Sequence, residues 1–195
     1  MPIEDTYQPS LVETAADRLV IISGCSGGGK STLLAELARR GHAVYEEAGR
    51  QVVKEQLHIG GDGLPWSDAG KFAELTISRS MHNMISAART GRLAFFDRGI
   101  VDQIAGSAQS GLQVGVHLRE AARRFRCRRT VFMAPPWPEI FRNDAERRHS
   151  FEHAAANYGP LRAAYEGLGY RIVELPKASV AARADFVEGL IESTG

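Results

Sequence analysis

The sequence has little cysteine, almost no net charge and no long apolar run. Its 195 residues include two cysteines, Cys25 and Cys127, too few for a disulfide framework or a cysteine-based zinc site. The net charge of +1 does not indicate a nucleic-acid-binding protein. No apolar stretch approaches the roughly 20 residues of a membrane helix, and the N-terminus MPIEDTYQPS is too polar for a secretory signal. We therefore expect a cytoplasmic protein without a membrane partner.

Length and composition predict a single domain over residues 1–195. Hydrophobic residues make up 44% of the chain, which is ordinary for a globular domain, and no long Pro/Gly-rich or polar linker interrupts it. Within this domain we expect residues 1–17 to form an N-terminal arm and residues from about 136 to 150 to form a lid segment.

Strand-like and helix-like segments alternate along the chain. Apolar runs predict strands at 19–22, 42–46, 93–96, 130–134 and 170–175. Helical patterns follow the first strand directly and recur at about 49–57, 67–89, 100–108, 117–126, 151–167 and 179–192. This alternation predicts an α/β fold with a five-stranded parallel sheet between two layers of helices.

The stretch GCSGGGKS joins the first strand to the first helix. Gly24, Gly29, Lys30 and Ser31 match G-x-x-x-x-G-K-[ST], the phosphate-binding loop, in its required context. Glycines let successive N–H groups converge on a phosphate at a helix N-terminus. Lys30 would add charge at the β- and γ-phosphates, and the Ser31 hydroxyl would ligate Mg²⁺. The residues expected to contact ATP or GTP are Gly24, Cys25, Ser26, Gly27, Gly28, Gly29, Lys30, Ser31 and Thr32. The alternative, a glycine-rich helix cap, would not need Lys30.

An acidic residue follows each of two further strands. Asp97 ends the third strand, at the edge where open α/β sheets bind ligands, and is predicted to hold Mg²⁺ or substrate. The alternative is a helix N-cap. Arg98 would then face phosphate or substrate. Glu46 and Glu47 end the second strand and point to opposite faces, so one of them is placed to accept the proton of an attacking hydroxyl. Two solvated glutamates are the alternative.

Several basic and aromatic residues have less specific interpretations. The segment 142–148 carries arginines suited to closing over a phosphoryl group, although a solvated charged helix explains it equally well. A denser basic run, 119–129, is best explained as a solvated helix. His149 and His153 have the spacing of metal ligands, but no third ligand completes a zinc site. Trp66 and Trp137 either line a substrate pocket or pack, and packing is favoured for Trp137.

The motifs GCSGGGKS, YEEAGR, FFDRG and the arginine-bearing stretch after the fourth strand resemble P-loop kinases. The chain is similar to deoxynucleoside kinases, and more so to predicted AAA-family ATPases grouped with the ribosylnicotinamide kinase domain of the bacterial NAD regulator. The resemblance implies a strand order of 2-3-1-4-5. In that kinase group the acid after the second strand binds substrate or acts as base, which falls on Glu47, with Arg50 three residues on. The Asp-Arg pair after the third strand falls on Asp97 and Arg98. The resemblance places the lid arginines at Arg142 and at Arg147 or Arg148.

These observations predict a Mg²⁺-dependent phosphotransferase that uses ATP or GTP and acts on a small, nucleoside-like acceptor. Lys30, Asp97, Glu47 and Arg147 are the expected catalytic residues. We expect the loop 60–66 to help form the acceptor pocket. The alternative is a nucleotide-hydrolysing switch that signals to a protein partner. A mechanical AAA+ motor is a weaker alternative, because a single helix is expected after the fifth strand.

Overall fold

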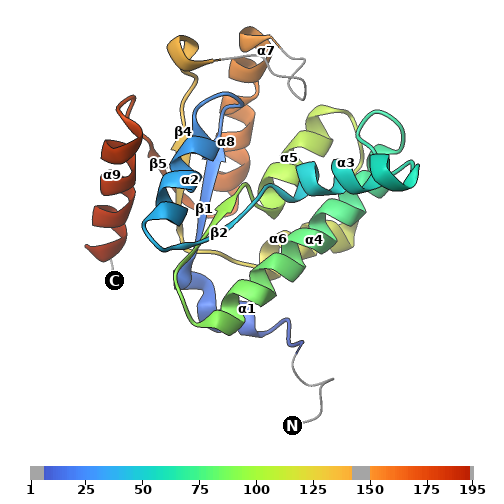
Figure 1. Cartoon of the computed structure of the whole chain (residues 1–195). Helices are drawn as coiled ribbons and strands as arrows, with labels where there is room; N and C mark the ends of the chain where they lie inside the picture. The colour runs from blue at the N-terminus through green and yellow to red at the C-terminus, as the bar shows by residue number, and fades with distance from the viewer. Residues whose placement is uncertain (1–6, 142–149, 194–195) are drawn as a thin grey trace.

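A five-stranded parallel sheet forms the centre of the computed structural model, which describes residues 7–141 and 150–193 (Figure 1). The strands are β1 (Leu19–Gly24), β2 (Ala43–Tyr45), β3 (Ala94–Asp97), β4 (Thr130–Ala134) and β5 (Arg171–Glu174). They lie in the order β2-β3-β1-β4-β5, and every neighbouring pair is parallel. The predicted fold class and strand order are confirmed.

Helices cover both faces of the sheet because side chains alternate along each strand. Val20 and Ile22 of β1 pack with α2 (Lys30–Arg39) and α9 (Val180–Glu192) on one face. Leu19 and Ile21 face a larger apolar cluster on the other side. The helices of that second layer are α1 (Leu11–Ala15), α4 (Ala69–Thr90), α5 (Ile100–Gln109), α6 (Val116–Arg124) and α8 (Tyr158–Gly167). Figure 1 shows α9 and the group α4, α5 and α6 on opposite sides of the sheet.

The remaining elements are the α-helices α3 (Ala48–Ile59) and α7 (Phe151–Ala156) and the 3₁₀ turns η2 (Ala16–Arg18) and η3 (Pro138–Ile140). The structure differs from the sequence expectation at two points. The single helix expected over 151–167 is two helices that meet at Asn157. Pro160 lies in the first turn of α8, where no backbone N–H is needed for a helical hydrogen bond. In a continuous helix over 151–167, this position would need an N–H donor, which proline lacks. The expected N-terminal arm is folded in part, since Val12 and Ala15 of α1 are buried.

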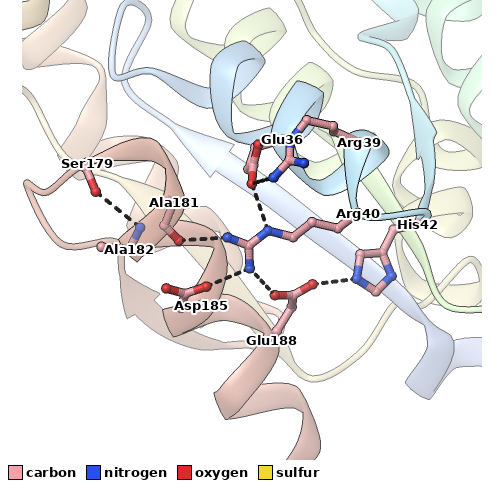
Figure 2. Close-up of polar contacts among 9 residues, drawn as sticks. All are labelled: Glu36, Arg39, Arg40, His42, Ser179, Ala181, Ala182, Asp185 and Glu188. Carbon is pink, nitrogen blue, oxygen red and sulfur yellow. Dashed lines mark hydrogen bonds and ion pairs between the residues drawn. The ribbon is translucent and has the colours of Figure 1, made fainter.

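An ion-pair cluster on the surface joins the C-terminal helix α9 to α2 (Figure 2). The Arg40 guanidinium contacts Glu36 at 2.9 Å, Asp185 at 2.6 Å and Glu188 at 2.5 Å. The His42 ring lies 2.7 Å from the other oxygen of Glu188. One arginine therefore links the end of α2 to two carboxylates of α9.

The carboxyl ends of all five parallel strands lie at the same edge of the sheet. The segments that leave this edge are the glycine-rich loop after β1, Glu47 after β2, Arg98 after β3, Pro135–Trp137 after β4 and Ala178–Ser179 after β5. Among the described residues, no helix combines the length and hydropathy needed to span a bilayer.

Candidate active site

The glycine-rich loop turns sharply between β1 and α2. Gly24 has φ of +111°, and a Cβ there would lie 2.3 Å from the carbonyl oxygen of Ala134 on β4. The Cys25 N–H donates to that same carbonyl at 2.9 Å. Gly29, with φ of +76°, precedes the first residue of α2. The loop therefore has backbone angles and close approaches that residues with a Cβ disfavour.

Lys30 lies beneath this loop at the start of α2. Its Nζ donates to the carbonyl oxygen of Cys25 at 2.9 Å, and the residue is 7% exposed. Burial, with the nearby charge of Arg98 as the next cause, lowers the pKa of Lys30 to about 8. The ammonium group is thus held where a phosphate would restore the solvation that burial removes.

Arg183 of α9 supports the loop from the other side. Its guanidinium donates to the carbonyl oxygens of Gly28 at 3.1 Å and Gly29 at 3.2 Å, and the residue is 1% exposed. The ring of Trp137 lies 5.8 Å from the guanidinium carbon. Arg183 was not among the residues predicted from the sequence. The available signal was its position on the apolar stripe of α9, four residues before Val187, because a charged residue rarely occupies such a stripe without a partner.

Asp97 ends β3 and faces the same cavity as Ser31. Its Oδ1 atom is buried and has no hydrogen-bond partner among residues 7–141 and 150–193. Burial raises the pKa of Asp97, and the charge of Lys30 partly opposes this. The alternative that Asp97 caps the next helix is wrong, because Gly99 is the N-cap of α5 and its N–H donates to Asp102.

Glu47 and Arg98 approach each other from the ends of β2 and β3. Arg98 Nε lies 3.4 Å from Glu47 Oε1, and Arg50 Nη2 lies 3.9 Å from Glu47 Oε2. Glu46 is exposed, as the alternation argument predicts for one glutamate of the pair. Arg98 has φ of +69°, a left-handed conformation that is uncommon for a residue with a side chain. Burial alone would lower the pKa of Arg98, but Glu47 and the other nearby carboxylates raise it above its usual value.

Asp102 is a further buried carboxylate, and it was not among the residues predicted from the sequence. It lies in the first turn of α5 and accepts a hydrogen bond from Arg98 Nη1 at 2.9 Å. The available signal was its position in the first turn of the predicted helix, three residues after Gly99, where an acidic side chain can accept from the N-cap N–H. Asp102 therefore connects α5 to the residues at the carboxyl edge of the sheet.

Two cavities meet at this edge. The first, of about 450 Å³, extends from the loop to the residues after β4 and β5 and includes Lys30, Ser31, Thr32, Arg50, Trp137 and Arg183. The second, of about 300 Å³, lies between α4, α5 and the α7–α8 junction and includes Thr76, Ser80, Gln103, His153 and Asn157. The residues that line both cavities are Ser26, Glu47, Asp97 and Arg98.

Some residues that the sequence suggested for a pocket are elsewhere. Trp66 is 67% exposed and lines neither cavity, and no residue of the loop 60–66 lines the second cavity. The expected contribution of this loop to an acceptor pocket is therefore wrong, because α4, α5 and the α7–α8 junction occupy that position. Trp137 lines the first cavity, contrary to the packing interpretation. Arg142, Arg147 and Arg148 lie outside the described residues, so their lid role stays a prediction.

The basic run and the cysteines have structural explanations. Arg119 donates to the carbonyl of Val114, Arg124 pairs with Glu120 and Arg126 stacks on Tyr170. The loop thiol has a raised pKa because it is buried, despite its place near a helix N-terminus, and burial raises the pKa of the other thiol to about 12. Neither cysteine has the low pKa of a reactive thiol.

Most of the chain matches the model of a known protein family. Residues 19–183 match the family model described as an AAA domain, which covers most of the chain. The chain belongs to this AAA domain family. It is a P-loop kinase-like NTPase in its fold, with the sheet order and the loop described above. A search of curated proteins finds no match.

Solved structures share the fold of this AAA domain at low sequence identity. A NadR protein in complex with NR superposes with a TM-score of 0.67 at 20% identity, over 89% of this chain and 52% of that chain. A NadR complex with NAD and AMP-PNP gives 0.58 at 20% identity, over 90% and 50%. Thymidylate kinase from Ehrlichia chaffeensis gives 0.58 at 14% identity, over 89% and 97%. The chain therefore spans about half the length of the NadR chains that it matches.

Proposed function

We propose that this AAA domain protein transfers the γ-phosphoryl group of ATP or GTP to a hydroxyl of a small, nucleoside-like acceptor. One observation carries the proposal: the cavity at the phosphate loop and the cavity beside α4 and α5 meet at Ser26, Glu47, Asp97 and Arg98. A phosphotransferase needs two adjoining pockets whose contents meet at the transferred group. A switch that only hydrolyses nucleotide needs room for water, so the second cavity favours an acceptor.

The first cavity suits a nucleotide. The phosphates would lie on the loop, where Lys30 offsets their charge, and the base would extend toward Trp137 and the segment 178–180 after β5. Trp137 offers a ring face for the base. The NadR complex with AMP-PNP supports this assignment through its shared fold.

Mg²⁺ fits the residues between loop and sheet. The buried Asp97 Oδ1 has no hydrogen-bond partner in the part of the chain that the structure describes, and Ser31 offers a hydroxyl in the same cavity. Carboxylate and hydroxyl oxygens are ligands that Mg²⁺ accepts, usually with phosphate oxygens and waters. When bound there, the ion would neutralise charge that develops on the transferred group.

The second cavity suits a small polar acceptor. Glu47 is placed at the junction to accept the proton of the attacking hydroxyl, while Arg98 and Arg50 hold its carboxylate. Hydroxyl, amide and imidazole groups line the rest of the cavity, which suits hydrogen bonding to a hydroxylated molecule. The NadR complex with NR and the thymidylate kinase, as structures of the same fold, support a nucleoside-like acceptor. We also propose a cytoplasmic location.

The direct test is a search for product. Purified protein is incubated with Mg-ATP or Mg-GTP and a panel of nucleosides and related hydroxylated metabolites, and mass spectrometry detects any compound that gains a phosphoryl group. A phosphorylated nucleoside-like compound formed by the parent and not by Lys30→Ala supports the proposal. Nucleotide hydrolysis without any phosphorylated product would favour the switch.

A further inference from the structure

The carboxylate of Asp102 is saturated with hydrogen bonds although its side chain is only 5% exposed. Oδ1 accepts from Ser23 Oγ at 2.6 Å and from Arg98 Nη1 at 2.9 Å. Oδ2 accepts from the Gly99 N–H at 2.8 Å and from the Tyr165 hydroxyl. These donors come from β1, from the β3–α5 connection and from α8, so Asp102 is fixed by three parts of the chain.

Arg98 is the only one of these donors that also lines both cavities. Its guanidinium is shared between two carboxylates, with Nη1 on Asp102 and Nε 3.4 Å from Glu47. Its backbone is also fixed, because the Arg98 N–H donates to the Ile22 carbonyl at 3.0 Å while φ is +69°. The backbone thus fixes where this side chain starts, and Asp102 fixes where its charged end lies.

We propose that Asp102 is a positioning residue, which acts through Arg98 to hold Glu47 at the junction of the two cavities. With Asp102 present, Arg98 contacts only the Oε1 atom of Glu47, at 3.4 Å. The Oε2 atom of Glu47 faces Arg50 instead. Without that anchor, the guanidinium is free to form a paired, fork-like contact with Glu47. Such a contact would turn the Glu47 carboxylate away from the acceptor and occupy its lone pairs.

The role of Asp102 in catalysis rests on the proposed function, whereas its hold on Arg98 does not. Two measurements therefore separate the two ideas. The first is the kinetics of Mg-ATP hydrolysis without an added acceptor, in which water takes the place of the acceptor. The second is the hydrogen exchange of the Arg98 guanidinium, followed by NMR of ¹⁵N-arginine-labelled protein without ligand and assigned by its loss in Arg98→Gln.

For Asp102→Asn we expect kcat to fall about 10²-fold, because misplacement by about an ångström costs rates of that order. The Kd for Mg-ATP should change by less than about threefold, since the loop contacts remain. Adding Asp102→Asn to Arg98→Gln should lower kcat by less than about twofold further, because residues that act as a unit are not additive. An unchanged kcat in Asp102→Asn, or full multiplication of the two effects, would overturn the proposal.

Tyr165→Phe is the matched control. It removes one hydrogen bond to Asp102 but leaves the contact with Arg98, so it should lower the melting temperature while kcat stays within about twofold of the parent. A purely structural Asp102 would instead make Tyr165→Phe and Asp102→Asn lose activity in proportion to stability.

The NMR measurement tests the hold of Asp102 on Arg98 even if Asp102→Asn folds poorly or the parent hydrolyses no nucleotide. In the parent and in Tyr165→Phe, the Arg98 guanidinium protons should exchange more slowly than those of exposed arginines. In Asp102→Asn, where it folds, this protection should be lost. Rapid exchange of the Arg98 protons in the parent would overturn the inference without bearing on the proposed phosphotransfer.

Discussion

Arg183 Nη2 donates to the carbonyl oxygen of Gly28 at 3.1 Å, across 155 residues of sequence, and so fixes the phosphate loop from the C-terminal helix. A buried guanidinium usually has a carboxylate partner. In residues 7–141 and 150–193 it has none within ion-pair distance, and burial lowers its pKa. Arg183 therefore orients the loop and, under the proposed function, adds positive charge beside the nucleotide phosphates.

Arg183→Met should weaken Mg-ATP binding about tenfold, because it removes a charge and two charge-assisted hydrogen bonds to the loop. Isothermal titration calorimetry gives the Kd directly. Arg183→Lys is the control: it keeps the charge without the forked geometry and should give an intermediate Kd. A Kd within twofold of the parent in Arg183→Met would contradict a supporting role for Arg183.

Lys30→Met should stabilise the free protein and remove its response to nucleotide. The parent should gain about 2.7 kcal/mol at a hundredfold excess of Mg-ATP over Kd, which is about 5–10 °C in melting temperature. Lys30→Met should gain almost nothing. An equal nucleotide-induced shift in the two proteins would contradict the assignment of Lys30.

The same lysine predicts a pH dependence of stability. Its pKa is about 8 in the folded protein, below the ordinary value of 10.5, so the unfolded chain binds more protons between these values. The free energy of unfolding of the parent should therefore rise with pH from about 8 to about 10.5, and Lys30→Met should lack that rise. Urea titrations of both proteins at pH 7.5, 9 and 10 measure the difference.

The phosphate loop was predictable because its motif is local: glycines, Lys30 and a hydroxyl lie within eight residues between a strand and a helix. The approximate place of Asp97 and Glu47 followed from the ends of apolar strands. Asp102 and Arg183 each carried a local signal, in the first turn of α5 and on the apolar stripe of α9. Their distant partners could not be read from it: Ser23 lies 79 residues from Asp102, and Gly28 lies 155 from Arg183. No local pattern encodes such tertiary contacts.

The errors also have physical reasons. The hydrophobic periodicity over 151–167 continues through Asn157 and so predicted one helix. Pro160, a residue typical of a first helical turn, indicated that a second helix begins just before it. The loop 60–66 follows Glu47 closely in the sequence. In the structure, however, α3 lies between them and carries the loop away from the carboxyl edge of the sheet, before the chain returns in α4 (Figure 1).

Asp97→Asn should lower kcat about 10²-fold or more while the Kd for nucleotide without Mg²⁺ stays within about threefold, because a metal contact matters most as charge moves. The Mg²⁺ concentration for half-maximal rate should rise. Asp62→Asn is the control, since Asp62 is an exposed carboxylate that pairs with Lys71 away from both cavities. Equal kcat in Asp97→Asn and the parent would leave Asp97 without a role in the reaction.

Arg40→Gln should lower the melting temperature by about 2–4 °C near pH 7, because several carboxylates lose their shared partner (Figure 2). Hydrogen bonds from Arg39 and Arg40 lower the pKa of Glu36 to about 2 from 4.5. The stability that this pairing contributes is present above about pH 4.5 and is lost as the pH falls toward 2. The difference between Arg40→Gln and the parent should therefore shrink over that range.

Arg39→Gln provides the comparison for Arg40→Gln, because the Arg39 side chain is 73% exposed and pairs with Glu36 alone among the described contacts. Its effect near pH 7 should be smaller. If both variants melt like the parent at pH 7, the cluster between α2 and α9 does not stabilise the fold.

The most direct test of phosphotransfer is the effect of an acceptor on nucleotide turnover in the parent and in Glu47→Gln. We predict that a nucleoside-like compound raises the turnover of Mg-ATP or Mg-GTP by the parent about 10²-fold or more, because positioning an acceptor supplies much of the available catalysis. Glu47→Gln should lose that stimulation while its nucleotide Kd stays within about threefold of the parent. If no compound in a broad panel stimulates turnover and Glu47→Gln hydrolyses ATP like the parent, the second cavity is not an acceptor site and the central claim is wrong.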